Sequence, residues 1–243
     1  MSNFTVAAGR PAGLRVETEI VFCLAVIALL SLWPSVHLLD LAVQPFFFDA
    51  GAGRWLIPPD DRGPQFLVFY KGVKIAFGIA GGGAVLWLIV RAARRRWSLR
   101  DTRLAAALCV LALTPLIVGL LKKMTGVSCP AQELVFGGPY AHTAIWDRLI
   151  FLVPGNVHFR CWPAGHASAG FGLMGLRLLA PAAQRFGIHW LPALGAGWGM
   201  GLYQMARGQH YLSHTIVTMM LAILLSGLAL VILERTIVRV DRG

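Results

Sequence analysis

Long apolar runs, separated by short polar segments, recur along the sequence and constrain the fold more than any other feature. Several runs of about 18 or more residues carry almost no charge, which is long enough for a helix to cross a hydrocarbon core of about 30 Å. Apolar residues make up 57% of the chain, more than a water-soluble domain of 243 residues can bury. We therefore expect residues 1–243 to form one all-α, polytopic membrane domain rather than two soluble domains.

The apolar runs predict a bundle of about six membrane-spanning helices. Their approximate bounds are residues 19–41, 65–91, 104–121, 163–182, 188–206 and 211–234. Arginine-rich loops stay on the cytoplasmic side, so the arginines between the second and third runs place that loop inside. We then expect both termini to be cytoplasmic and the segments 42–64, 122–162 and 207–210 to lie outside. The first run is interpreted as an uncleaved span, because no clean cleavage site follows it.

The net charge of +11 is compatible with nucleic-acid binding, but its distribution argues against that class. The arginines cluster beside apolar runs, in segments 91–103 and 235–242, where anionic lipid headgroups are their natural neighbours. No basic stripe alternates with stacking aromatic residues, as nucleic-acid binding would require. The expected partner is therefore a lipid bilayer and not a nucleic acid, and the sequence gives no indication of an oligomeric state.

Chemically reactive side chains gather at the predicted outer ends of spans three to six. The three patches are KKMTGVSCP at 122–130, RCWPAGHAS at 160–168 and QMARGQHYLSH at 204–214. A single lysine at a span end is usually an interfacial side chain, and a single histidine there is usually a simple polar group. The coincidence of all three patches on one face is what indicates a site.

The second patch has the features of a phosphate-binding helix start. Pro163 sets the first turn, and the small residues Ala164 and Gly165 leave backbone N–H groups exposed. Such a helix end attracts phosphate through its unpaired donors and its dipole. His166, the next residue, is placed to donate a proton to a leaving oxygen.

The first and third patches supply a nucleophile and positive charge. His210 and His214 are four residues apart, so on a helix they share a face and one imidazole can orient the other. Lys122 and Arg207 offer the positive charge that a phosphoryl group needs in its transition state. The residue types therefore favour phosphoryl transfer.

Together the patches resemble the three-part signature of the type 2 phosphatidic acid phosphatase family, which also includes vanadium haloperoxidases. That signature is lysine, six residues, arginine-proline; then proline-serine-glycine-histidine; then serine-arginine, five residues, histidine, three residues, aspartate. The family's six-span layout, with its site at the outer ends of the later spans, covers almost the whole chain. The residues that match, in chain order, are Lys122, Pro130, Pro163, Gly165, His166 and His210.

The chain departs from the signature at several positions. Cys129 replaces the first arginine, Ala164 the serine, Gln204 the second arginine and His214 the closing aspartate. Both arginines that bind phosphate in the family are therefore absent from their places, a costly loss unless other charges substitute. A bacterial subgroup of the family carries similar CP, PAGHAS and RG-x-H-x-x-SH segments, so the chain resembles an atypical member.

Two other arginines are candidates to replace the missing pair. Arg160 lies just before the second motif, and Arg207 lies three residues after Gln204. We expect both to bind phosphate together with Lys122 and Gly165. Residues 122–214 would then hold the whole catalytic core.

The resemblance implies a lipid phosphatase that uses no metal and no cofactor. His210 would be the nucleophile and form a phosphohistidine, and His214 would orient it. His166 would protonate the leaving group and then activate water. The substrate would be a phosphomonoester or pyrophosphate on a membrane lipid, at the periplasmic face of a bacterial inner membrane. No residue pattern selects one lipid.

Three functions are alternatives to a lipid phosphatase. A phosphotransferase would pass the phosphoryl group from the same phosphohistidine to a lipid hydroxyl. A catalytically impaired protein would keep the pocket and bind lipid phosphates, as the missing arginines suggest. A transporter is disfavoured because the centres of the spans hold almost no ionisable residues.

The cysteines and the remaining histidines complete the set of candidate functional residues. Cys129 and Cys161 fall in one external loop, where an oxidising environment favours a disulfide. A Cys/His metal cluster with His158 and His166 is the alternative, but the spacing fits no strong zinc pattern. The long outer loop containing Glu133 is expected to form a lid. The histidines interpreted as non-catalytic are His37, His142, His158 and His189.

Overall fold

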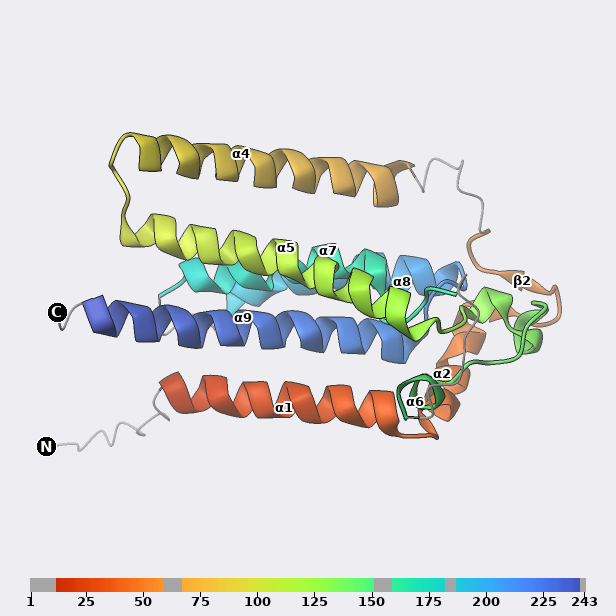
Figure 1. Ribbon diagram of the computed structural model, residues 1–243. Helices are drawn as coiled ribbons and strands as arrows, with labels where there is room; N and C mark the ends of the chain where they lie inside the picture. The colour runs from red at the N-terminus through yellow and green to blue at the C-terminus, as the bar shows by residue number, and fades with distance from the viewer. Residues whose placement is uncertain (1–11, 59–66, 151–158, 182–186, 241–243) are drawn as a thin grey trace, which may run out of the picture.

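The computed structural model describes residues 12–58, 67–150, 159–181 and 187–240. Four long helices run side by side: α1 (Ala12–Leu32), α4 (Val73–Ala93), α5 (Leu99–Thr125) and α9 (Leu212–Val240) (Figure 1). The shorter helices α7 (Gly165–Gly172) and α8 (Leu191–Ala206) pack against α5 and α9. The chain is therefore mostly helical, as its apolar runs predict.

Short elements connect these helices, mainly at the end of the bundle opposite the start of α1. The chain leaves α1 through α2 (Val36–Val43), whose axis is bent by 86° from that of α1 after Pro34. Strands β1 (Phe48–Asp49) and β2 (Arg54–Trp55) then form an antiparallel pair, with Phe48 opposite Trp55. The remaining short helical elements are η1 (Gln44–Phe46), η2 (Leu67–Gly72), η3 (Pro130–Gln132), η4 (Leu134–Phe136), α6 (Ile145–Ile150), η5 (Leu173–Leu179) and η7 (Ile188–Trp190).

The prediction of six spans is confirmed only in part. By length and composition, three stretches within the described residues can each cross a membrane: Ile75–Ala93, Leu99–Gln132 and Leu212–Thr236. The bent pair Arg15–Leu32 and Val36–Phe46 makes a fourth if it counts as one span. The fourth predicted run folds as α7 followed by η5, and the fifth as η7 followed by the 16-residue α8. The six-span count remains a prediction.

The short helix α7 packs closely against α5, α8 and α9. A Cβ on Gly170 would lie 2.5 Å from the backbone nitrogen of Gly197 in α8, and one on Gly197 would overlap the Phe171 ring. Only glycines allow the two helix backbones to meet here. Phe171 and Met174 are fully buried at this crossing. The packing fixes α7 against α8, and with it the position of the α7 N-terminus.

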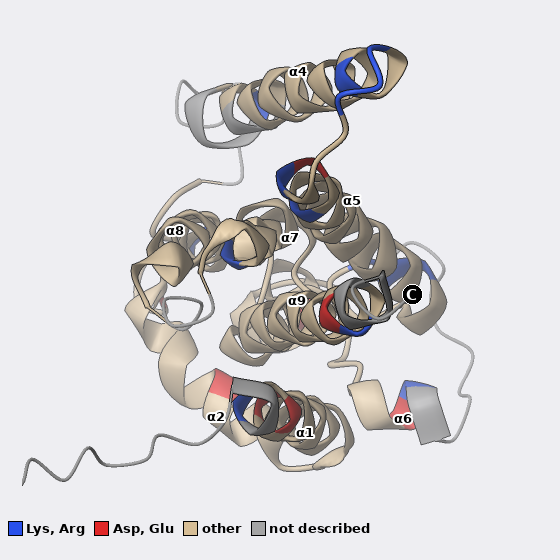
Figure 2. Cartoon of the chain, turned by 90° about the vertical axis from the view of Figure 1, so that its left-hand side faces the viewer, with Lys and Arg blue, Asp and Glu red and all other residues tan. Residues whose placement is uncertain are grey.

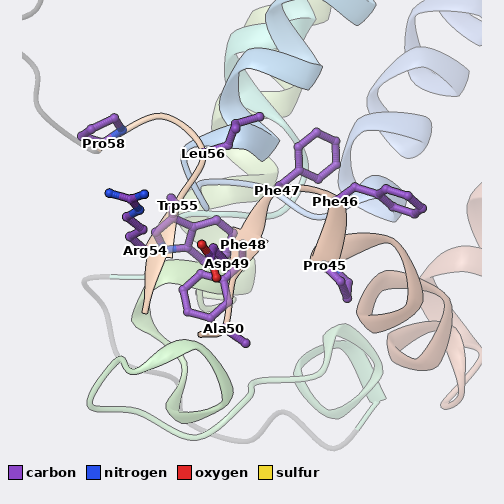
Figure 3. A pocket seen from close by; sticks show the side chains of 10 residues that line it. All are labelled: Pro45, Phe46, Phe47, Phe48, Asp49, Ala50, Arg54, Trp55, Leu56 and Pro58. Carbon is purple, nitrogen blue, oxygen red and sulfur yellow. The ribbon is translucent and has the colours of Figure 1, made fainter. Parts of the chain in front are cut away.

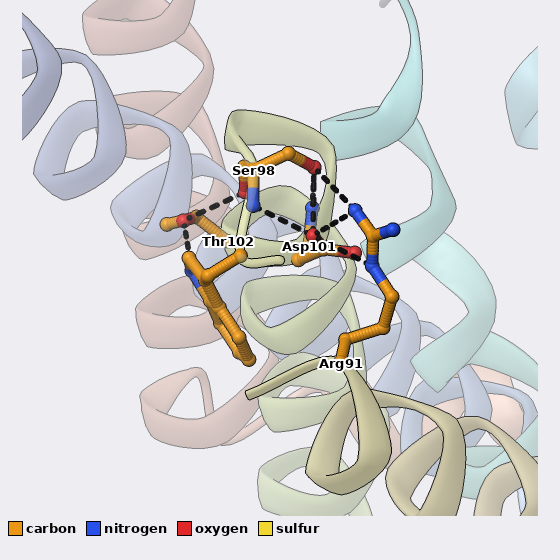
Figure 4. Close-up of polar contacts among 5 residues, drawn as sticks. Arg91, Ser98, Asp101 and Thr102 are labelled. Carbon is orange, nitrogen blue, oxygen red and sulfur yellow. Dashed lines mark hydrogen bonds and ion pairs between the residues drawn. The ribbon is translucent and has the colours of Figure 1, made fainter. Parts of the chain in front are cut away.

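The opposite end of the bundle carries the arginine-rich loop between α4 and α5, as Figure 2 shows. Arg91 forms an ion pair of 2.9 Å with Asp101, and Asp101 also caps the start of α5 together with Ser98 (Figure 4). The beginning of α1 and the end of α9 lie at this same end (Figure 1). The location of the two termini, and the side of the membrane on which this end lies, remain predictions.

Candidate active site

The three sequence patches meet at the end of the bundle that carries β1 and β2 (Figure 1). Lys122 lies in the last turn of α5, and His166 lies in the first turn of α7. His210 lies in the loop between α8 and α9. Its ring centre is 6.3 Å from that of His166 and 6.1 Å from that of His214. The predicted convergence of Lys122, His166, His210 and His214 at one end is therefore observed.

A pocket of about 290 Å³ opens between α5, α7 and α8. Its polar end is formed by Lys122, Gly165 and His166, and a Cβ added to Gly165 would lie 2.9 Å from the ammonium nitrogen of Lys122. The absence of a side chain at Gly165 thus leaves room for the lysine at the N-terminus of α7. The other residues that line the pocket are Pro115, Ser168, Ala169 and Met200.

The helix start at the second patch differs slightly from the predicted one. The helix α7 begins at Gly165, with Ala164 as its N-cap, so Pro163 precedes the first turn instead of forming part of it. The peptide bond between Trp162 and Pro163 is cis. The first residues of α7 are nevertheless at the pocket, as the motif predicts.

His210 is held by a backbone carbonyl. Its Nδ1 lies 2.7 Å from the carbonyl oxygen of Cys161, and the side chain is almost fully buried. A carbonyl oxygen only accepts hydrogen bonds, so Nδ1 is the donor and carries the ring proton. The lone pair of the neutral ring is then on Nε2, which is the form that a nucleophilic histidine requires.

His214 does not orient His210 by the hydrogen bond that the sequence suggested. Its Nδ1 lies 2.9 Å from the same carbonyl oxygen of Cys161, so the two histidines share one acceptor. Within the described residues, no hydrogen bond joins the two rings. The spacing of four residues does place the rings on one side of the α9 start, but the chain between α6 and α7 supplies the acceptor.

Burial lowers the pKa of His210 well below its ordinary value of 6.5, and the nearby Lys122, His214 and His166 lower it further. The ring therefore stays neutral in the folded protein at pH values where an exposed histidine takes up a proton. Because the unfolded chain binds that proton at higher pH, the stability contributed by neutral His210 is present above about pH 6.5 and is lost as the pH falls.

We expect the His210 ring to show no titration between pH 8 and pH 6 in the folded protein. The measurement is the ¹⁵N imidazole chemical shift of His210 in detergent-solubilised protein, assigned by comparison with a His210→Gln variant. His189, which lies outside the site, serves as the internal reference. A His210 midpoint at or above 6.5 would show that the buried ring is not held neutral.

Two carboxylates that the motifs did not indicate hold the segment around the histidines. Asp40, in α2, accepts hydrogen bonds from the backbone N–H of Ser213 at 2.9 Å and from its hydroxyl at 2.6 Å. Glu133 accepts from the hydroxyl of Tyr211 at 2.6 Å. Residues 211 and 213 are therefore fixed by side chains from two distant parts of the chain.

Glu133, in the loop predicted to form a lid, belongs to a buried network. Besides the hydrogen bond from Tyr211, the Glu133 carboxylate accepts hydrogen bonds from the hydroxyl of Ser128 at 2.7 Å and from Nδ1 of His142 at 3.0 Å. Burial opposes ionisation of this carboxyl, but the hydrogen bonds from His142, Tyr211 and Ser128 hold its pKa below the ordinary value. The ring of His142 also stacks on that of His37, at 3.7 Å between centres. His142 is thus a hydrogen-bond partner of Glu133, and His37 packs on His142.

The two candidate arginines occupy different environments. Arg207 is buried at the end of α8, and its guanidinium carbon lies 5.6 Å from the ring centre of Tyr203. Arg160 is exposed. Gln204, at the place of the second family arginine, is buried. Of the two arginines, Arg207 is therefore the buried one, at the start of the loop that contains His210.

The first outer segment covers that loop. Gly208 has a left-handed backbone (φ 67°), and a side chain there would collide with the indole of Trp55. Trp55 also packs on Phe48, at 4.9 Å between ring centres, and the backbone N–H of Ile57 donates to the carbonyl of Ala206. A second, larger hollow of about 640 Å³ lies along this segment, between residues 45 and 58 (Figure 3).

Cys129 and Cys161 form the disulfide that their shared loop predicts, with 5.1 Å between the two Cα atoms. Their sulfur atoms are therefore not thiolates, which removes two ligands from the alternative Cys/His metal cluster. His158, the third residue of that cluster, lies outside the described residues. No group of three or more metal-ligating side chains is found in the described ranges.

A sequence model of the PAP2 superfamily matches residues 103–237, which is more than half of the chain and contains every motif discussed above. The chain belongs to the PAP2 superfamily. No curated protein and no solved structure gives a significant match. PAP2 membership supports phosphatase activity on phosphate esters, and the apolar helices make this a membrane protein of the family.

Proposed function

We propose that this PAP2 protein is an integral membrane lipid phosphatase that works through a phosphohistidine at His210. The observation that carries the proposal is the state of His210. The ring is buried, donates from Nδ1 to a carbonyl and lies beside His166 and the Lys122 end of the pocket. A neutral, oriented imidazole next to a cation and an acid is the set that phosphoryl transfer through a covalent intermediate needs.

In the first step, Nε2 of His210 attacks the phosphorus atom and the bond to the leaving oxygen breaks. His166 gives its proton to that oxygen, so the lipid leaves as an alcohol or, from a pyrophosphate, as a monophosphate. In the second step, His166 takes a proton from water, and the hydroxide formed attacks the phosphohistidine. Inorganic phosphate is released and His210 returns to its neutral form.

The charge on the phosphate is balanced by groups at the polar end of the pocket. Lys122 and the backbone N–H groups at the start of α7, including that of Gly165, would hold the phosphate oxygens. Arg207 would add the second cation that the family signature normally supplies, whereas exposed Arg160 would contact only an incoming headgroup. His214 would keep its bond to the Cys161 carbonyl throughout.

The shape of the pocket supports a lipid as the substrate. Pro115 lies seven residues before Lys122 on α5, about 10 Å deeper along the helix, and lines the same pocket. Ala169 and Met200 form the apolar wall next to it. A substrate with a phosphate at one end and a hydrocarbon chain at the other fits both ends, at the proposed periplasmic face.

The test is a phosphate-release assay with the purified protein in detergent. Three substrates are compared: a long-chain phosphatidic acid, an isoprenoid pyrophosphate and a water-soluble phosphomonoester. We expect phosphate release from at least one of the lipids, with kcat/KM at least about tenfold above that of the soluble ester. Equal kcat/KM values for the lipids and the soluble ester would contradict the assignment of a lipid substrate. Release of no phosphate from any of the three substrates would contradict the proposed phosphatase activity. Product analysis with an added lipid alcohol separates hydrolysis from phosphotransfer.

A further inference from the structure

We propose that the main-chain carbonyl of Cys161, held in place by the Cys129–Cys161 disulfide, is the group that orients the nucleophile His210. The disulfide then acts as a positioning element for catalysis, and activity depends on its oxidised state. This inference rests on the proposed phosphatase function.

The carbonyl occupies the role that the family signature gives to a carboxylate. His214 stands where that aspartate is expected, and its Nδ1 donates a hydrogen bond instead of accepting one from His210. The Cys161 oxygen accepts from both rings, at 2.7 Å from His210 and 2.9 Å from His214, which uses its two lone pairs. The direction of the Nε2 lone pair of His210 is thus set by one backbone oxygen.

Three links hold that oxygen against the end of α5. The disulfide joins Cys161 to Cys129, and the backbone N–H of Cys161 donates to the carbonyl of Val127 at 3.1 Å. The hydroxyl of Thr125 donates to the carbonyl of the next residue, Trp162, at 3.0 Å. The disulfide is the only covalent link among these three. Without it, the segment before α7 is held there only by noncovalent contacts, namely these hydrogen bonds and the packing of Trp162 in the core.

The same link connects the catalytic groups of three separate elements. Lys122 lies seven residues before Cys129, and His166 lies five residues after Cys161. His210 hydrogen-bonds to Cys161 itself. A shift of the carbonyl by a fraction of an ångström therefore turns the nucleophile relative to both the cation and the acid, which is enough to slow an oriented attack.

A positioning role and a purely stabilising role predict different kinetics. Loss of an orienting group lowers kcat. The groups that bind the phosphate stay in place, so KM is unchanged. Loss of a stabilising cross-link lowers the melting temperature and leaves the kcat of the folded fraction unchanged. The two roles are separated by measuring both quantities on the same preparations.

The experiment compares Cys129→Ala with Cys109→Ala, which removes an exposed free cysteine of α5. On a lipid phosphate hydrolysed by the wild type, we expect Cys129→Ala to lower kcat about tenfold or more with KM within about twofold, and Cys109→Ala to change neither. Treating the wild type with a membrane-permeant thiol reductant should reproduce the loss without any substitution. The reductant should have no effect on Cys129→Ala.

The ¹⁵N signals of His210 give a second readout that needs no turnover. In the oxidised protein the ring should be the Nδ1–H tautomer, and in reduced protein a mixture of tautomers. An unchanged kcat and an unchanged tautomer after complete reduction, shown by mass spectrometry, would overturn the proposal. A wild type with the Nδ1–H tautomer but no phosphatase activity would contradict the proposed function and leave the orienting bond established.

Discussion

Replacing His210 with alanine is expected to lower kcat/KM for lipid phosphate hydrolysis by about 10³-fold or more. The imidazole is proposed to form the covalent bond to phosphorus, and the nearest rings cannot take its place. His166 is 6.3 Å away between ring centres, and the Nδ1 of His214 is bonded to the Cys161 carbonyl. The measurement is phosphate release by purified variants, in detergent, at matched protein concentration.

His189→Ala is the matched control, because His189 lies in η7, before α8, and not in the site. It should keep the wild-type rate. Since His210 is almost fully buried, the thermal stability of His210→Ala is measured as well, and the comparison uses the folded fraction. Turnover at the wild-type rate by folded His210→Ala would refute the proposed nucleophile.

Removing the ammonium group in Lys122→Ala should lower kcat/KM by about 10²-fold, as the loss of one charged donor to a developing phosphoryl charge typically does. Lys122 lies in the pocket against Gly165, where a phosphate would meet both the lysine and the N-terminus of α7. The helix dipole and Arg207 would remain, so the loss should be smaller than for His210→Ala. The measurement is the same phosphate-release assay.

The adjacent lysine is the control for this variant. Lys123 is exposed and does not line the pocket, so Lys123→Ala removes the same charge from the same helix end. Its kcat/KM should stay within about twofold of the wild type. Equal losses in the two variants would mean that Lys122 acts only through the general charge of the surface.

The groups that the sequence predicts best are side chains that belong to short local motifs. Lys122, His166 and His210 could be assigned because each lies at the end of an apolar run, and the topology of the runs brings those ends together. The disulfide between Cys129 and Cys161 could be expected from their place in one outer loop. In each case the information lies in the residue type and in its position relative to the apolar runs.

What could not be predicted depends on tertiary contacts. The acceptor of the His210 hydrogen bond is a backbone carbonyl, which every residue has, so no letter in the sequence marks Cys161 for this contact. Asp40 and Glu133 come from segments far from residues 211–213 and match no motif. The spacing of His210 and His214 suggested a direct hydrogen bond between the rings. Instead, both rings donate a hydrogen bond to the carbonyl oxygen of Cys161.

The fourth and fifth predicted runs are helical, but neither is one uninterrupted α-helix, and the reason is local. Hydropathy counts apolar residues over a window but does not register the points at which a helix ends. The α-helix that starts at Gly165 gives way to a tighter helical turn at Leu173, and the chain reaches Pro181 soon after. Close packing against α8, made possible by Gly170 and Gly197, stabilises these short pieces inside the bundle.

The most direct test of the account is to trap the enzyme-bound phosphate. The protein is mixed with a lipid labelled with ³²P at its phosphate, quenched in alkaline detergent within the first turnover, and mapped by mass spectrometry. The account predicts an acid-labile phosphoryl group on His210, absent from His210→Ala and formed more slowly after reduction of the disulfide. Phosphate release without any labelled protein, or with the label on another residue, would contradict it.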